Sequence, residues 1–337
     1  MNQVVHIANK KDFLKMRFLI TQYIREFFWS EGFLEVETPS ILKTSGQEPN
    51  IQAMKVVAHN ERHESFQGYL ATYPEYTMKK MIVAGFDKIF TICKAFRDHE
   101  SFGGTHNPEF TIIEWYRNGK DFFALMDDME HMFHFIARRL EEQGYPVPAN
   151  LKQSWKRSPI PGLWKQYAEV NLDNYLDKDS MYQLCVEKGY KPEAGESYEE
   201  LFYRIFLNHI EKHLGNDGPE IIYHYPALMA SLSKRSTRAP GYAERFEAYY
   251  NNIEIANGFT ELTDADEQLK RLEADKTERA RLKLDDYEID NEFIDAVHQL
   301  PECTGNSMGI DRIVQVFTGC KNIDNVIALP MSRIFNS

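Results

Sequence analysis

The stretch that most constrains the fold runs from residue 89 to residue 117 and reads as two strands joined by a polar loop. Residues 89–96 and 110–116 are rich in β-branched and aromatic side chains, which favour strands, whereas residues 98–107 are polar and contain two glycines. Side chains alternate between the two faces of a strand. One face of the second strand is therefore predicted to carry Phe110, Ile112, Glu114 and Tyr116.

Two charged residues on this hairpin suggest more than a structural role. Arg97 ends the first strand and carries a fixed charge that can hold a phosphate group. Glu114 lies within an apolar strand, where a carboxylate is costly unless a cation meets it. The pattern leaves two interpretations open: an internal Arg97–Glu114 ion pair in an ordinary hairpin, or a site that binds an anion and a cation.

The sequence motif in this hairpin is long enough to suggest a protein family. FR, a loop and HNPEFTxxEWY resemble motif 2 of the class II aminoacyl-tRNA synthetases, in the form typical of the lysyl branch. A helix over residues 13–30 and a short strand over 33–37, followed by Pro39, resemble motif 1 of that class. GNSMGIDRIVQV, residues 305–316, resembles motif 3. The resemblance implies an α+β fold with an antiparallel sheet flanked by helices.

We expect residues 1–337 to form a single catalytic domain, with a helical and loop insertion over about residues 145–220. Apolar residues at helical spacing predict helices over 13–30 and 121–142, and alternating charges predict a solvated helix over 267–284. The first helix carries an aromatic stripe of Phe18, Leu19, Tyr23, Phe27 and Phe28. This stripe fits either a core helix or, as the resemblance implies, the interface of a homodimer.

The resemblance implies a role for each matched residue in binding ATP. The implied ATP site consists of Arg97, Glu100, His106, Asn107, Phe110, Glu247 and Arg312. Arg97 and Arg312 are the implied catalytic residues, at the α-phosphate and the far end of the triphosphate. Glu247 and Glu254 would hold Mg²⁺. For the three acids Glu247, Glu254 and Glu261, exposure on an edge strand remains the alternative.

The same resemblance implies a pocket for lysine or β-lysine made of Glu75, Glu114, Tyr116, Asn257, Glu261 and Ser307. Glu254 and Asn257 are three residues apart, so a regular strand would point them to opposite faces, and we expect a β-bulge near Gly258. Tyr73 stands where the family usually has serine, which is expected to alter the pocket wall. Glu75 could instead be a simple partner of a helix dipole.

The loop after Arg97 departs from the family pattern. Asp98, His99 and Glu100 follow the arginine, so either His99 or Glu100 could take the place of the family's glutamate. Thr105 replaces an arginine that usually precedes HNPEF, which weakens the case for gripping a tRNA end. The HIEKH run at His209 to His213 could present two metal ligands, but we favour a solvated helix face.

Composition limits the possible partners and location. The net charge is −12, from 51 acidic and 39 basic residues, which disfavours broad binding to nucleic acid. The four cysteines form no CxxC pair, and the first residues lack an apolar signal region. We expect free thiols, no membrane span and a cytoplasmic location.

The motif 1 helix starts near residue 13, so we expect no anticodon-binding domain ahead of it. The resemblance is closest to shorter paralogues of the lysyl branch, which use ATP to attach lysine or β-lysine to a lysine side chain of elongation factor P. Two alternatives remain: a minimal synthetase that charges a tRNA-like acceptor, and a non-catalytic regulator that binds lysine or an adenylate. Ser307 leaves the choice between α- and β-lysine open.

Overall fold

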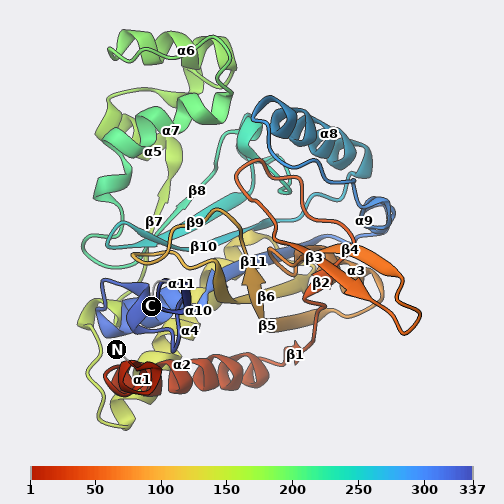
Figure 1. Ribbon diagram of the computed structural model, residues 1–337. Coiled ribbons are helices and arrows are strands. Elements are labelled where there is room, and N and C mark those ends of the chain that lie inside the picture. The colour runs from red at the N-terminus through yellow and green to blue at the C-terminus, as the bar shows by residue number, and fades with distance from the viewer. Residues whose placement is uncertain (1, 336–337) are drawn as a thin grey trace.

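The computed structural model describes residues 2–335 and contains one large sheet and one small one (Figure 1). The large sheet has eight strands, in the spatial order β1 (Leu34–Glu35), β5 (Lys88–Phe96), β6 (Glu109–Asn118), β11 (Cys303–Gly309), β10 (Ile253–Thr260), β9 (Arg245–Tyr250), β8 (Glu220–Tyr223) and β7 (Lys156–Pro159). Only the edge pairs β1–β5 and β7–β8 are parallel within this sheet. The predicted α+β fold with a mainly antiparallel sheet is confirmed.

The helices lie on both sides of this sheet. They are α1 (Gln3–Ala8), α2 (Lys11–Ser30), α3 (Glu75–Val83), α4 (Phe122–Glu142), α5 (Ile160–Leu163), α6 (Lys178–Glu187), α7 (Tyr198–His209), α8 (Ala265–Arg281), α9 (Asn291–Val297), α10 (Ile310–Thr318) and α11 (Met331–Phe335). Helices α2, α4 and α10 cover one face and build the main core with it. The opposite face of the central strands is left for a cavity.

The predicted hairpin of residues 89–117 is β5 and β6. Ala95 pairs with Phe110, and Thr91 pairs with Glu114, so Glu114 lies several residues along the strand from Arg97. Within residues 2–335 no ion pair joins Arg97 to Glu114, and the ordinary-hairpin interpretation is therefore wrong. The predicted alternation holds, because Trp115 is fully buried in the core behind the sheet.

The aromatic stripe of α2 is mostly a core feature. Tyr23, Phe27 and Phe28 are buried, and the Phe28 ring stacks on Phe90 with centroids 5.0 Å apart. Phe18, in contrast, is 64% exposed. The stripe is therefore divided between the core of this chain and its outer surface.

The predicted insertion has a core of its own but also extends the sheet. Helices α5, α6 and α7 pack around Trp164 and Phe202, beyond the β7–β8 edge of the sheet (Figure 1). The prediction of helices and loops alone missed β7, which pairs in parallel with β8. This pairing joins the insertion to the main sheet.

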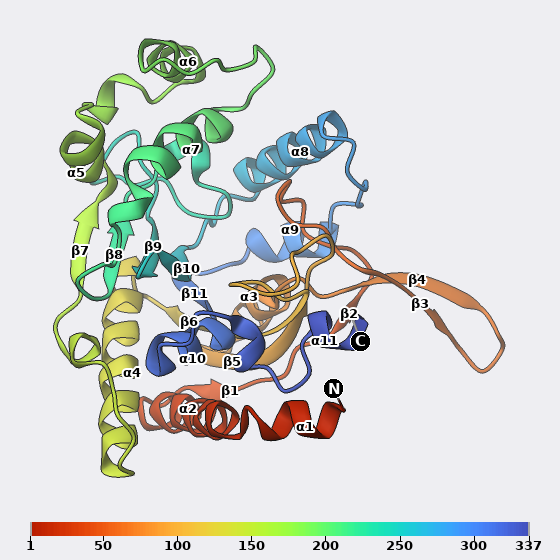
Figure 2. The same cartoon turned by 60° about the vertical axis from the view of Figure 1, so that its left-hand side comes forward.

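Three further elements complete the fold. Residues 303–309 form the central strand β11, and α10 begins at Ile310. Helix α3 begins at Glu75, and Pro74 is its N-cap residue. The small sheet consists of β2 (Ile41–Leu42), β4 (Ser65–Leu70) and β3 (Lys55–His59), and its β3–β4 hairpin projects from the body in Figure 2.

Two compositional expectations can be compared with the structure. All four cysteines are free, as expected. In the part of the chain that the structure describes, no helix has the length and apolar character needed to cross a membrane. The cytoplasmic location stays a prediction.

Candidate active site

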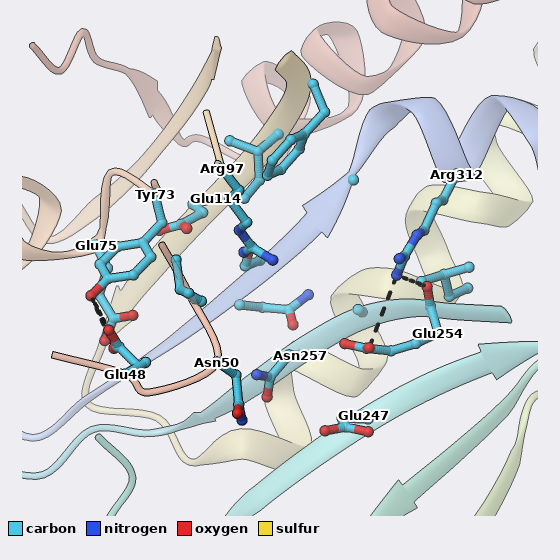
Figure 3. Close-up of a pocket in the computed structure, with 18 of the residues that line it drawn as sticks. Glu48, Asn50, Tyr73, Glu75, Arg97, Glu114, Glu247, Glu254, Asn257 and Arg312 are labelled. Carbon is cyan, nitrogen blue, oxygen red and sulfur yellow. Dashed lines mark hydrogen bonds and ion pairs between the residues drawn. The ribbon is translucent and has the colours of Figure 1, made fainter. Parts of the chain in front are cut away.

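A row of polar residues crosses the middle of the large sheet. The strand register aligns Thr91, Glu114, Ser307, Asn257 and Glu247, one from each of five neighbouring strands. Directly paired residues share a face, and adjacent strands lie about 4.8 Å apart, so these side chains form a line. All but Thr91 line a cavity of about 470 Å³. Figure 3 shows Glu114, Asn257 and Glu247 around it.

A β-bulge brings Glu254 and Asn257 to the same face, but its position differs from the prediction. The register of β10 shifts between Glu254 and Ala256, not near Gly258. Gly258 serves another purpose, since a Cβ there would lie 2.5 Å from the Phe246 ring and would also meet the Asn306 side chain. The glycine allows close packing, and the extra residue of the bulge is Ile255.

One end of the cavity presents arginines that suit phosphate groups. The Arg97 guanidinium lies 5.1 Å from the centroid of the Phe110 ring, and its Nε atom is buried without a hydrogen-bond partner. Arg312 donates from Nη1 to the backbone oxygen of Glu254 at 2.7 Å, and its Nη2 lies 3.2 Å from Nε2 of His106. Backbone contacts fix Arg312 while Arg97 keeps free donors.

The motif 2 loop places Glu100 on this cavity. Its Oε2 atom lies 4.0 Å from Nε2 of His106, and both residues line the cavity. His99 has a left-handed backbone (φ 61°) and an exposed side chain outside the lining. Burial and the nearby Arg312 lower the pKa of His106. Of the two candidates for the family's glutamate, Glu100 is the one on the cavity side.

Asn107 lines the cavity, but both polar groups of its side chain form hydrogen bonds with backbone atoms. Its Nδ2 donates to the backbone oxygen of Glu109 at 2.5 Å, and its Oδ1 accepts from the backbone nitrogen of Met331 at 2.9 Å. The residue therefore ties the motif 2 strand to α11.

The two acids expected to hold a metal differ in their surroundings. Glu247 accepts hydrogen bonds from Tyr225 at 2.5 Å, Tyr249 at 2.8 Å and Arg245 at 2.9 Å. Glu254 faces the cavity, with Oε2 3.9 Å from Nη1 of Arg312 (Figure 3). Burial in the cavity and the neighbouring Glu247 raise the pKa of Glu254 to about 7. Three hydrogen bonds thus fix the carboxylate of Glu247, whereas the carboxylate of Glu254 is available to a ligand in the cavity.

The opposite end of the cavity is acidic. Glu114 is 2% exposed, and its Oε2 atom lies 3.5 Å from the Tyr116 hydroxyl, with Ser307 opposite it on β11. Burial and the nearby Glu75 raise the pKa of Glu114 well above its ordinary value. Among the described residues no cationic side chain lies within ion-pair distance of it. A bound ammonium group would satisfy this carboxylate.

Lys79 is the main residue of this region that the sequence interpretation missed. It is 1% exposed and forms ion pairs of 2.6 Å with both Glu75 and Glu261. Glu261 lies outside the cavity lining, behind Gly305, whose added Cβ would lie 2.6 Å from Oε1 of Glu261. The spacing of four residues between Glu75 and Lys79 was a signal for their pairing, but nothing in the sequence indicated that Glu261 pairs with Lys79.

The cavity is also lined by residues outside the predicted ATP and amino-acid sites. Glu48 and Tyr73 face each other across its edge, with the Tyr73 hydroxyl 2.9 and 2.8 Å from the two carboxylate oxygens (Figure 3). Tyr203 and Glu199 of α7 bring the insertion to the same wall. Only the unusual Tyr73 had been singled out from the sequence.

No group of three or more histidine, cysteine or acidic residues arranged to hold a metal occurs within residues 2–335. His209 lies 3.1 Å from the Tyr190 hydroxyl, and His213 stacks on Tyr167 with centroids 4.3 Å apart. Both histidines of the HIEKH run therefore make contacts with tyrosine side chains.

The mainly antiparallel sheet flanked by helices agrees with a comparison with known protein families. Residues 3–333 match the family model of class II tRNA synthetases for aspartate, lysine and asparagine (D, K and N). The chain belongs to this family. The predicted resemblance is confirmed.

Curated relatives narrow the similarity further. The chain is 35% identical to "Elongation factor P--(R)-beta-lysine ligase" of Yersinia enterocolitica, over 95% of both chains. It is 33% identical to the protein of the same name from Salmonella arizonae, over 97% of both chains. These relatives confirm the prediction of a ligase related to enzymes that modify elongation factor P.

Proposed function

We propose that this protein uses ATP to activate lysine or β-lysine as an aminoacyl-adenylate and transfers it to a lysine side chain of elongation factor P. The observation that carries the proposal is a single cavity with Arg97 and Arg312 at one end and the unpaired, buried Glu114 at the other. Such a cavity suits a triphosphate beside an amino acid with a side-chain amine. The names of the relatives support the acceptor.

The phosphate end would act mainly through position and charge. Arg97 would hold the α-phosphate as the carboxylate of the amino acid attacks phosphorus and pyrophosphate leaves. Phe110, beneath the Arg97 guanidinium, would stack on adenine. Arg312, with His106 and Glu100 beside it, would face the far phosphates. The acceptor amine would then attack the adenylate carbonyl and release AMP.

The same end could hold Mg²⁺, which would neutralise phosphate charge when bound. Glu254 is suited to bind a metal ion, because it faces the cavity, and because burial and Glu247 raise its pKa even with Arg312 3.9 Å away, so that a further cation would stabilise its charged form. Glu247 has less capacity to bind a metal ion. Its carboxylate already accepts three hydrogen bonds, and a carboxylate accepts about four in total. We propose Glu254 as the main protein ligand, with Glu247 contributing its remaining acceptor position.

At the acidic end, Glu114, Tyr116 and Ser307 would bind the side-chain amine of the substrate. Glu75 and Asn257 would bind the groups at its carboxyl end, and Asn257 has a buried Oδ1 atom with no partner. Glu261 would act indirectly, through Lys79. A substrate without the amine would leave Glu114 unpaired, which is costly for a buried carboxylate.

The two alternatives have less support. A tRNA acceptor would demand many phosphate contacts, whereas the net charge is −12 and Thr105 replaces the basic loop residue. A regulator that only binds lysine would have no use for two arginines at a phosphate end. We therefore propose that tRNA is not the acceptor.

ATP–pyrophosphate exchange with α-lysine and β-lysine tests the adenylation step. We expect Mg²⁺-dependent exchange that Glu254→Gln lowers by at least about a hundredfold, because a charged metal ligand is lost. Glu247→Gln should in addition lower the melting temperature, because it leaves Arg245 with a weaker partner. Exchange that is unchanged in Glu254→Gln would remove this residue from the metal site.

We also propose a homodimer that uses the outer face of the first helices. Large apolar side chains are exposed there, namely Val4, Val5, Phe18, Trp29 and Leu34. They lie on α1, α2 and β1, along one side of the molecule in Figure 2. Light scattering at micromolar concentration should show a dimer, and Phe18→Asp should give monomers. A monomeric wild-type protein would contradict this proposal.

A further inference from the structure

One residue, Tyr73, separates the candidate active site from a second cavity. The second cavity has a volume of about 380 Å³ and lies between the loop of residues 42–46, the start of α3 and residues 288–292. Tyr73 lines both cavities. Several residues around the second cavity, including Lys43, Glu288 and Glu292, are exposed, so it opens to the surface. The tyrosine side chain is therefore part of a wall between the active site and the outside.

This wall is locked by contacts among Gly46, Glu48 and Tyr73. The Tyr73 hydroxyl lies 2.9 Å from Oε1 and 2.8 Å from Oε2 of Glu48. The backbone of Gly46 approaches so closely that a Cβ atom there would clash with the Tyr73 hydroxyl and with Oε2 of Glu48. Glycine, tyrosine and glutamate thus fit one another, which indicates a defined position for the Glu48 carboxylate.

The Glu48 carboxylate has no cation of its own. Tyr73 is its hydrogen-bond partner, and among the described residues no lysine, arginine or histidine nitrogen lies within ion-pair distance of it. Glu75 stands close by on the same side of the cavity (Figure 3). Burial and repulsion from Glu75 raise the pKa of Glu48. Lys79 already binds Glu75, so Glu48 is the acid at this wall that lacks a cation.

We propose that Glu48 is a further specificity-determining residue, which binds the amine nearest to the substrate's carboxyl group, and that Tyr73 positions Glu48 and closes the pocket behind that amine. The inference rests on the proposed function, because it assumes a diamino acid substrate in this cavity. The inference narrows the class of amino acid that the site accepts: the amine near the carboxyl group must be a free ammonium without a bulky substituent.

Four variants separate the charge, the hydrogen bond and the size of the wall. Glu48→Gln removes the charge, Tyr73→Phe removes the hydroxyl and keeps the ring, and Tyr73→Ser opens the wall to the second cavity. Gly46→Ala disturbs the same contact without changing either partner. Glu64→Gln, on the exposed tip of the β3–β4 hairpin, is the matched control for loss of a carboxylate. Melting temperatures check that each variant is folded.

The assay is ATP–pyrophosphate exchange with α-lysine, β-lysine and Nα-methyl-lysine. Glu48→Gln should raise KM for both lysines by at least about tenfold and change kcat little, because a charge-assisted hydrogen bond to the substrate is lost. Tyr73→Phe and Gly46→Ala should raise KM less and still reject Nα-methyl-lysine. Tyr73→Ser should reduce that rejection by about tenfold or more, because space for the methyl group is created. Glu64→Gln should match the wild type.

Two results would overturn the inference alone: an active wild type with an unchanged KM in Glu48→Gln, or a Tyr73→Ser variant that rejects Nα-methyl-lysine as strongly as the wild type. Folded wild-type protein that exchanges pyrophosphate with neither lysine would overturn the proposed function, and this role of Glu48 with it.

Discussion

Lys79 determines how much negative charge the amino-acid end of the cavity carries. Three carboxylates, those of Glu75, Glu114 and Glu261, lie near one buried lysine ammonium, and the carboxylate of Glu48 lies near Glu75. Lys79 pairs directly with Glu75 and Glu261, whereas Glu48 and Glu114 have no cation within ion-pair distance among the described residues. If the proposed function holds, the two unpaired acids would favour an amino acid that carries a cationic side chain.

Lys79→Met should destabilise the fold by about 3–5 kcal/mol, because it leaves two buried carboxylates without their cation. The measurement is the free energy of unfolding from urea denaturation. Lys80→Met provides a matched control on the next residue, since Lys80 pairs with Asp290 at 2.8 Å but is one-third exposed. A surface pair of that kind contributes about 0–1 kcal/mol. Equal losses in the two variants would contradict the structural role of Lys79.

Strand β11 joins the two halves of the site. It lies between β6 and β10 and places Ser307 between Glu114 and Asn257. Gly305, on the same strand, lets Tyr116 and Glu261 approach closely. The strand is short of β-branched and aromatic residues, so its pattern alone did not predict it.

Gly305→Ala should destabilise the fold by about 1–3 kcal/mol, because the added methyl group meets Glu261 and the Tyr116 ring and forces a local shift. KM for lysine should rise as well, since Tyr116 lines the amino-acid end. Gly195→Ala is the control, as a Cβ there meets nothing within 4 Å. The test combines urea denaturation with pyrophosphate exchange, and a stable Gly305→Ala variant with normal KM would contradict this account.

The hairpin and the site differ in how well the sequence predicted them. Local alternation correctly placed Phe110, Ile112, Glu114 and Tyr116 on the cavity face, because neighbours along a strand determine that pattern. The partners of these residues come from distant parts of the chain. Lys79 and Glu261 are an example, since only the folded sheet brings them within 2.6 Å. The bulge was likewise anticipated from the spacing of Glu254 and Asn257, but its position at Ile255 was not.

Residues of both the main sheet and the insertion line the cavity. Helix α7 contributes Glu199 and Tyr203 to the lining, and Asn50 of the loop after β2 donates to Glu199 at 3.4 Å. The insertion, which was expected only as helices and loops between motifs, therefore forms part of the site wall. The net charge of −12 is the reason why we propose a basic protein acceptor and not a polyanion.

Intact-mass measurement of elongation factor P tests the proposed function. The factor is incubated with this protein, ATP, Mg²⁺ and lysine or β-lysine, and the labelling of total tRNA is measured in parallel. The proposed function predicts a factor heavier by one lysyl group and no labelled tRNA. Arg97→Ala should lower the modification by at least about a hundredfold, because charge stabilisation at the reacting phosphorus is lost. An unmodified factor together with labelled tRNA would contradict the proposal and identify a minimal synthetase instead.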